Sequence, residues 1–145
     1  PTADGDFIRR YYAKDGYAIA YAIREGYKIC VISGGRGEML RRRLEMLGVT
    51  RIYLNCMDKT AAMAEFIADY NLNPENIIYM GDDIPDYEVM RQVGVATCPA
   101  DAAIEIKEIA DYISHLRGGE GCVRDVIEQV LRLHNNWFHP DAVNW

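Results

Sequence analysis

The sequence of 145 residues lacks several features that would mark a specialised class of protein. It has no apolar run long enough to cross a membrane and no signal-peptide pattern. Its four cysteines are widely spaced without a CxxC pair, which favours thiols in a reducing compartment over disulfides or zinc. It has no excess of positive charge, and its net charge of −6 argues against a broad nucleic-acid-binding surface. We therefore predict a cytoplasmic globular protein that binds neither nucleic acid nor membranes.

Short apolar runs alternate with helical patterns along the chain, and no repeat or linker interrupts them. Residues 28–33, 51–54, 76–80, 95–98 and 112–113 favour strands, and residues 18–25, 38–47, 58–70, 86–93, 102–109 and 123–133 favour helices. This alternation predicts one α/β domain over residues 1–145, a Rossmann-like parallel sheet with helices on both faces. Right-handed crossovers then bring the carboxyl ends of all strands to one edge, where such sheets bind ligands.

The two ends of the chain depart from this alternation. Asp4 and Gly5 indicate a turn and residues 7–12 a possible strand, so we predict a projecting β-hairpin over residues 1–13. Residues 134–145 form a C-terminal tail with three large aromatic residues, Trp137, Phe138 and Trp145. This tail could either cover the core or anchor an interface with another subunit.

The strongest local signal for chemistry is the GDDIPD segment at 81–86, which directly follows a buried-strand pattern. The carboxylates of Asp82, Asp83 and Asp86 repel one another unless a cation or proton lies among them. Hard oxygen ligands at the end of a strand suit Mg²⁺. A solvated turn before an acidic helix N-terminus explains the segment equally well. By itself, the segment leaves both interpretations open.

Two weaker signals are expected at the same edge of the sheet. Ser33 ends one strand and is followed by Gly34 and Gly35, and a hydroxyl with exposed N–H groups can bind an anion. Lys59 lies at the start of the helix predicted at 58–70 and could neutralise a phosphoryl group. Taken singly, an ordinary turn and an ordinary surface lysine are the commoner explanations.

Together, Ser-Gly after one strand, Lys at a helix start and GDD after a third strand resemble motifs of the haloacid dehalogenase-like superfamily. Nearly the whole chain from Lys14 onward resembles one branch, the cap-less 3-deoxy-D-manno-octulosonate 8-phosphate (KDO 8-P) phosphatases. The matching segments are KDGYAI, VISGG, RRRLEMLGV, DKTAA, IIYMGDDIPDYEVM, VGVA and RGGEGCVRDVIEQVL.

The resemblance implies a Mg²⁺-dependent phosphatase that works through an aspartyl-phosphate. It assigns roles to eleven residues of this chain. Those near the metal are Asp82 and Asp86; the catalytic residues are Ser33, Lys59 and Asp83; and those that bind the sugar-acid phosphate are Gly34, Gly35, Lys14, Asp15, Arg43 and Arg117.

The family's DxDG motif, which carries the nucleophile and the general acid, has no match in this chain. The Asp4-Gly5-Asp6 segment follows no apolar strand and fits the turn of the hairpin better. We therefore expect the nucleophile strand to lie before Pro1. The chain as written is not expected to form the phospho-enzyme.

The resemblance also implies a homotetramer, a role in lipopolysaccharide biosynthesis and KDO 8-P as the substrate. A sialic-acid branch of the family has Glu at the place of Gly35, so glycine favours an eight-carbon acid over nine-carbon KDN or sialic acid 9-phosphates. A non-catalytic subunit of the same fold is the second alternative. A receiver domain of the response-regulator type is disfavoured, because SGG and RGGEG have no place in it.

Overall fold

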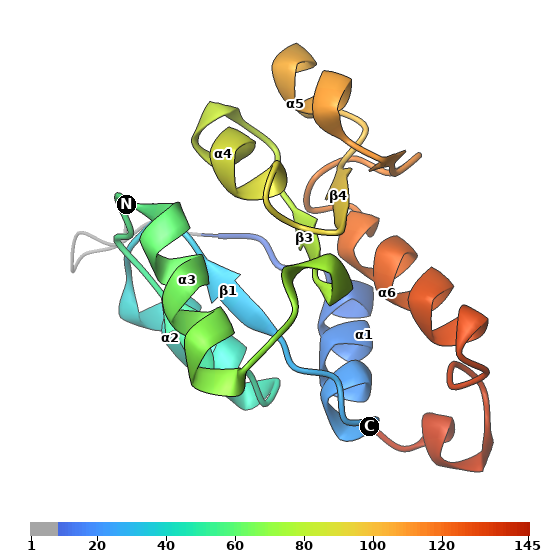
Figure 1. The fold of residues 1–145 in the computed structure, drawn as a ribbon. Helices are drawn as coiled ribbons and strands as arrows, with labels where there is room; N and C mark the ends of the chain where they lie inside the picture. The colour runs from blue at the N-terminus through green and yellow to red at the C-terminus, as the bar shows by residue number, and fades with distance from the viewer. Residues whose placement is uncertain (1–8) are drawn as a thin grey trace.

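The computed structural model describes residues 9–145, in which parallel strands alternate with helices (Figure 1). The strands are β1 (Cys30–Ile32), β2 (Arg51–Tyr53), β3 (Ile78–Met80), β4 (Val95–Cys98) and β5 (Tyr112–Ile113). The α-helices are α1 (Ala13–Arg24), α2 (Glu38–Met46), α3 (Lys59–Tyr70), α4 (Tyr87–Met90), α5 (Ile104–Ile109) and α6 (Cys122–Leu133). Short 3₁₀ helices are η1 (Pro74–Asn76), η2 (Ile84–Asp86) and η3 (Pro140–Val143). The predicted α/β fold with parallel strands is confirmed.

The strands form two parallel sheets instead of one continuous sheet. One sheet has the order β1-β2, with Val31 opposite Ile52, and the other has the order β3-β4-β5, with Tyr79 opposite Ala96. Within residues 9–145, β1 and β3 therefore each pair with a strand on one side only. Every predicted strand between residues 28 and 113 is present, although three are shorter than predicted: 28–33 becomes Cys30–Ile32, 51–54 becomes Arg51–Tyr53, and 76–80 becomes Ile78–Met80.

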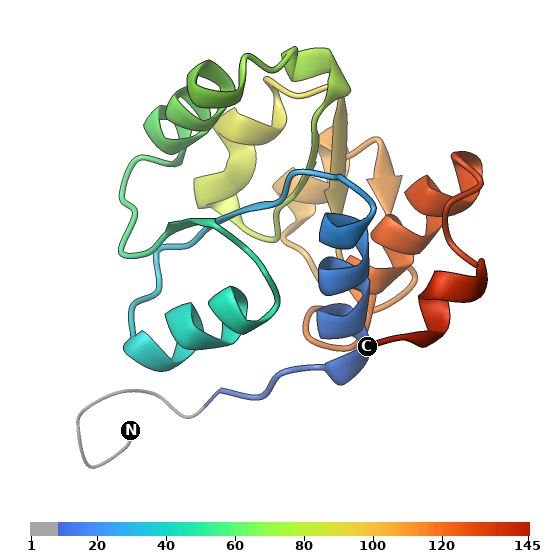
Figure 2. The ribbon, with the colours of Figure 1, turned by 90° about the horizontal axis from the view of Figure 1, so that it is seen from below.

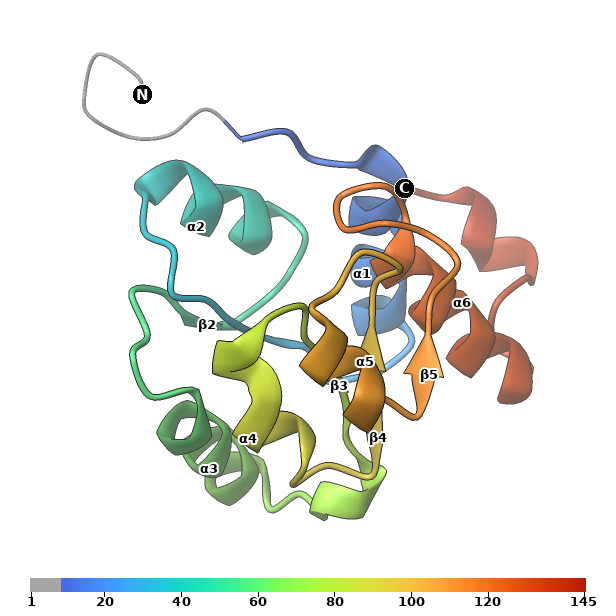
Figure 3. The ribbon, with the colours of Figure 1, turned by 90° about the horizontal axis from the view of Figure 1, so that it is seen from above.

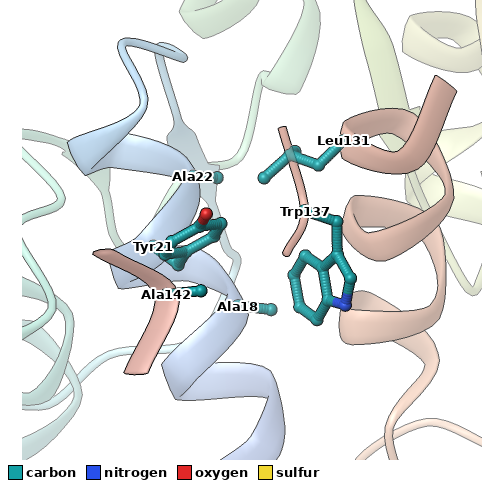
Figure 4. Packing of buried hydrophobic residues seen from close by; sticks show 6 residues of the cluster. All are labelled: Ala18, Tyr21, Ala22, Leu131, Trp137 and Ala142. Carbon is teal, nitrogen blue, oxygen red and sulfur yellow. The ribbon is translucent and has the colours of Figure 1, made fainter. Parts of the chain in front are cut away.

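Helices α1 and α6 lie side by side on one face of the strands (Figures 1 and 2). Ala18 and Ala22 are four residues apart on α1, so they share one face, and their small side chains allow α6 to approach closely. They pack with Tyr21, Leu131, Trp137 and Ala142 in a buried cluster (Figure 4). This cluster holds the C-terminal part of the chain against α1.

The other face is covered by α3 and α4, opposite α1 and α6 (Figure 3). Met63 and Phe66 of α3 pack with Val89 of α4 in a buried cluster against the strands. A further cluster under α5 includes Cys98 and Ile106, both 0% exposed. Helices on both faces of parallel strands are what the alternating sequence predicted.

Several predicted boundaries differ from the structure. Helix α1 begins at Ala13 and not at residue 18, so the KDG segment forms its first turn, where the acidic Asp15 suits the helix dipole. The helix predicted at 86–93 is the 3₁₀ helix η2 followed by the short α4, because Pro85 lies at the start of η2. Residues 9–12 form no strand, and the rest of the predicted hairpin lies outside the described residues.

The aromatic tail is divided between core and surface. Trp137 is 7% exposed and meets the ring of Tyr21 edge-on, with ring centroids 5.7 Å apart. Phe138 and Trp145 are 80% and 71% exposed. The tail therefore covers the core through Trp137, while the predicted subunit contact stays a prediction for the two exposed rings. None of the helices in residues 9–145 is long and apolar enough to span a membrane.

Candidate active site

The segments that follow β1, β2 and β3 meet at one edge of the strands. The backbone amide of Cys56, after β2, donates to the Ser33 carbonyl at 3.0 Å. In the same segment Lys59 begins α3, and its Nζ lies 2.7 Å from Oδ1 of Asp86. The backbone amide of Asp82 donates to Oδ2 of Asp86 at 3.0 Å. These bonds connect Ser33, Lys59 and the GDDIPD segment, which the sequence places far apart.

Asp86 is the buried centre of this arrangement, with 3% of its surface exposed. Its Oδ1 accepts hydrogen bonds from Lys59 and from the Tyr79 hydroxyl, each at 2.7 Å. Its Oδ2 accepts from the backbone amides of Asp82 and Asp83 at 3.0 and 3.4 Å. A carboxylate offers about four lone-pair positions, so these four donors satisfy it.

These contacts determine the charge state of Asp86. Burial alone would raise the pKa of this carboxyl, but hydrogen bonds from Lys59, Tyr79 and the Asp82 amide outweigh burial and hold the pKa below its ordinary value. Asp86 is therefore an anion that fixes the position of the Lys59 ammonium. Because hydrogen bonds occupy all four lone-pair positions, Asp86 is better suited to orient Lys59 than to bind a metal ion directly.

Gly81 is required by the position of Asp86. A Cβ at Gly81 would lie 2.5 Å from Cβ of Asp86 and 2.8 Å from Sδ of Met90. Since carbon atoms cannot approach so closely, any side chain here would displace Asp86. The glycine of the GDD motif thus allows the chain to turn back over its own aspartate after β3.

Asp82 and Asp83 lie at the surface beside the Lys59–Asp86 pair. Although Asp82 is exposed, neighbouring atoms partly shield its carboxyl from water; this desolvation, followed by the negative charge of Asp86, raises its pKa. Asp83 accepts a hydrogen bond from the Ile84 amide at 2.8 Å and caps η2. A cation near Asp82 would offset the partial desolvation of its carboxylate and the repulsion from Asp86.

The donor set fits Mg²⁺ in part. Among residues 9–145, no three His, Cys, Asp or Glu side chains are grouped so that they could hold a metal ion. Mg²⁺ commonly binds one or two carboxylates and fills its other positions with water and phosphate oxygens. Asp82 supplies one such carboxylate, and the other protein ligands would have to come from elsewhere.

The Ser33 loop has the form of an anion site. The amide of Gly35 donates to Oγ of Ser33 at 3.0 Å, which leaves the Ser33 hydroxyl proton to donate to a ligand. A Cβ at Gly35 would lie 3.2 Å from Nη2 of Arg9, and Arg9 donates to the Arg36 carbonyl at 3.0 Å. The sequence reasoning missed Arg9, because only the fold brings this basic residue beside Gly35.

The KDG segment lies on α1 between α2 and α6. Asp15 Oδ1 accepts from the backbone amide of Arg124, in the first turn of α6, at 2.9 Å. Gly16 is covered by Arg43 of α2, whose Nη2 would lie 2.6 Å from an added Cβ. Lys14 is exposed. The structure therefore brings Arg43 to the KDG segment at Gly16, and it gives Asp15 and Gly16 packing roles that the sequence did not reveal.

Arg117 lies on the exposed loop before α6. Its Nε is 3.7 Å from Oδ2 of Asp101, and the amide of Gly118 donates to Oδ1 of Asp101 at 2.8 Å. In the same segment the amide of Ala103 donates to the Asp82 carbonyl at 2.9 Å. Residues 101–103 thus connect the Arg117 loop to the GDDIPD segment.

The sequence profile of the haloacid dehalogenase-like hydrolases matches residues 48–124. The chain is 35% identical over 127 residues to the 3-deoxy-D-manno-octulosonate 8-phosphate phosphatase KdsC of Yersinia pestis, a match that covers 88% of this chain and 68% of that protein. About a third of that relative therefore lies outside the match.

Solved structures agree with the sequence comparison. The crystal structure of 3-deoxy-D-manno-octulosonate 8-phosphate phosphatase from Yersinia pestis superposes with a TM-score of 0.89 at 33% identity, covering 92% of this chain and 72% of that one. The Moraxella catarrhalis phosphatase, solved with magnesium, phosphate and KDO, has a TM-score of 0.88 at 27% identity, covering 93% and 78% of the two chains.

Proposed function

Because the chain belongs to the 3-deoxy-D-manno-octulosonate 8-phosphate phosphatases of the haloacid dehalogenase-like hydrolases, we propose that it forms most of a Mg²⁺-dependent phosphatase that releases phosphate from KDO 8-P. The observation that carries this proposal is the Lys59–Asp86 pair beside Asp82 and the Ser33 loop. The Moraxella catarrhalis structure with magnesium, phosphate and KDO supports the choice of metal and substrate.

Each residue at the edge has a proposed role in holding the phosphoryl group. The Ser33 hydroxyl and the Gly34 amide bind phosphoryl oxygens, Gly35 positions the Ser33 hydroxyl through its amide, and Lys59, held by Asp86, neutralises the phosphoryl charge. Asp82 holds Mg²⁺, which when bound polarises the phosphoryl group and reduces its repulsion of an attacking anion. Asp83, exposed beside Asp82, orients water near the metal.

The nucleophile of the proposed reaction is an aspartate on a strand N-terminal to Pro1. Its carboxylate forms a bond to phosphorus while the bond from phosphorus to the sugar oxygen breaks, and a second aspartate gives that oxygen a proton. Water then attacks the phosphorus of the aspartyl-phosphate and loses a proton to the second aspartate, while the bond from phosphorus to the first aspartate breaks, which frees that carboxylate and releases phosphate. Residues 1–145 supply the groups that bind the phosphoryl group in both steps.

The sugar acid is proposed to contact the basic residues around the site. The proposed contacts are Lys14, Arg43, which covers Gly16, and Arg117, which lies beside Asp101; a sugar carboxylate could pair with either guanidinium. Asp15 is proposed to contact a sugar hydroxyl. The wider proposals are a cytoplasmic homotetramer that acts in lipopolysaccharide biosynthesis, for which the family resemblance is the support.

The test is phosphate release by the full-length protein from KDO 8-P, compared with nine-carbon KDN and sialic acid 9-phosphates. We expect turnover of the eight-carbon substrate with Mg²⁺, loss of turnover with EDTA, and recovery when Mg²⁺ is restored. Preference for a nine-carbon substrate would mean that the protein is a KDN or sialic acid 9-phosphate phosphatase instead. Absence of phosphate release from all three, with the nucleophile aspartate present, would favour the non-catalytic subunit.

A further inference from the structure

The segment that leads into α1 runs along the rim of the candidate site. It passes beside α2 before it reaches the start of α1 (Figure 3). Arg9 lies beside Gly35 in the Ser33 loop. Two residues later, the guanidinium carbon of Arg43, on α2, lies 6.0 Å from the ring centre of Tyr11. This segment therefore connects the proposed phosphoryl site to Arg43, which is proposed to contact the sugar acid.

Arg9 and Ser33 approach each other around Gly35. A Cβ added at Gly35 would lie 3.1 Å from Oγ of Ser33, and 3.2 and 3.3 Å from Nη2 and Nη1 of Arg9. Nη2 and Oγ are therefore at most about 6 Å apart, a span that one oxyanion can bridge with a hydrogen bond to each. A side chain at position 35 would fill part of this space, so the glycine leaves room for the guanidinium.

A neutral group holds the guanidinium of Arg9 in this place. Its Nη2 donates to the backbone carbonyl of Arg36 at 3.0 Å. A guanidinium has five N–H donors, so this bond leaves others that can reach a ligand. Arg117, by contrast, lies 3.7 Å from the carboxylate of Asp101. Within residues 9–145, Arg9 is held by a carbonyl and not by a carboxylate, so its positive charge is available to an anion.

From this geometry we propose that Arg9 is a further substrate-binding residue, whose guanidinium donates to an oxyanion of the substrate beside the Ser33 hydroxyl. This inference rests on the proposed function, because a sugar-acid phosphate carries two oxyanions, its phosphoryl group and its carboxylate. The planar fork of donors in a guanidinium matches either group. The substrate site then includes the segment before α1 as well as the loops at the ends of the strands.

Binding without turnover tests this role. The probes are inorganic phosphate and KDO, each of which carries one of the two kinds of oxyanion. Their affinities for the full-length protein with Mg²⁺ are measured by isothermal titration calorimetry. We expect Arg9→Ala to weaken the binding of one probe by about tenfold or more, the loss typical of a hydrogen bond to a charged group. A loss with phosphate assigns Arg9 to the phosphoryl group, and a loss with KDO assigns it to the carboxylate.

Two variants and a rescue make the result specific. Arg10→Ala removes the same charge at the exposed neighbouring position and should leave both affinities unchanged. Arg9→Lys keeps the charge without the fork of donors and should lose less affinity than Arg9→Ala. Guanidinium ion added to Arg9→Ala should restore part of the lost affinity. A residue that only tied the segment to the Ser33 loop would give no such rescue.

Kinetics give an independent measure. Because the proposed contact is present before the reaction as well as during it, Arg9→Ala should raise KM for KDO 8-P about tenfold and change kcat little. Thermal unfolding of Arg9→Ala should match that of Arg10→Ala.

Three outcomes would overturn the role of Arg9. The first is unchanged affinity of Arg9→Ala for both probes. The second is an equal loss in Arg10→Ala, which would indicate a long-range effect of charge. The third is a loss of affinity that follows a loss of thermal stability. If Arg9→Ala weakens phosphate binding but the unaltered full-length protein releases no phosphate from KDO 8-P, the anion contact stands and the proposed function fails.

Discussion

Gly81 is a position in the site that has no room for a side chain. We expect Gly81→Ala to lower the free energy of unfolding by about 1–3 kcal/mol, because the methyl group would overlap Asp86 and Met90. Urea denaturation measures this change. Gly34→Ala is the matched control, because its methyl group would meet only the Cys56 carbonyl, at 3.8 Å. Equal stability of the two variants would contradict the close contact at Gly81.

Asp125 is a second residue whose contacts predict a measurable effect, this time on pH dependence. It accepts hydrogen bonds from the hydroxyls of Tyr112 and Ser114, each at 2.7 Å. Burial would raise its pKa, but hydrogen bonds from Ser114, Tyr112 and Gln129 outweigh burial and hold the pKa below the ordinary value of 3.8. The unfolded chain therefore binds this proton more readily than the folded one.

The sign of the effect follows from this difference. The stabilisation by Asp125 is fully present above about pH 5 and is lost as the pH falls through the folded-state pKa. We expect the advantage of the wild type over Asp125→Asn in urea, about 1–2 kcal/mol near pH 7, to shrink below pH 4. An advantage that stays constant from pH 7 to pH 3 would show that the charge of Asp125 contributes nothing.

At the scale of elements, α6 begins without a capping side chain of its own, because its N-cap residue is Gly121. Asp15 of α1 takes that place by accepting from the Arg124 amide. We expect Asp15→Ala to destabilise the fold by about 1 kcal/mol, and Asp15→Asn, which keeps an acceptor oxygen, by much less. Thermal unfolding compares the two. If both variants lose the same stability, the charge of Asp15 matters and the cap does not.

The alternating pattern of strands and helices was predictable from the sequence because each element has its own apolar periodicity. The boundaries of α1 and α4 were not, since they depend on contacts with distant residues. The first helix was expected to begin at residue 18, yet Gly16 lies inside α1 under Arg43. The split into two sheets was also not predicted. The sequence pattern indicates where strands lie and that they are parallel, but it does not indicate whether each strand has a neighbour on both sides.

The candidate site was predictable in part for a related reason. Ser33, Lys59 and Asp82 stand at the ends of strands or the starts of helices, so the rule for parallel sheets places them at one edge. The four hydrogen bonds to Asp86 and the approach of Arg9 to Gly35 depend on loop geometry, which short motifs do not encode. The roles predicted for Lys14, Arg43 and Arg117 stay predictions.

For the whole molecule, the C-terminal tail closes the core formed by α1 and α6. Trp137 contacts Tyr17 and Tyr21 edge-on and lies under the Arg124 guanidinium, 5.1 Å from its ring centre. We expect Trp137→Ala to cost about 3–5 kcal/mol and Phe138→Ala, at an exposed position, less than about 0.5 kcal/mol. Chemical denaturation distinguishes them. Similar losses for both would mean that the tail does not close the core.

The most direct measurement of the whole account is phosphate release from KDO 8-P by the full-length protein with Asp82→Asn, alongside Asp141→Asn, at an exposed position of η3, as a surface control. If Asp82 holds Mg²⁺ beside the Lys59–Asp86 pair, the first variant should lose about 100-fold or more in kcat while its stability is kept, and the second should remain active. Normal turnover by Asp82→Asn at saturating Mg²⁺ would contradict the account.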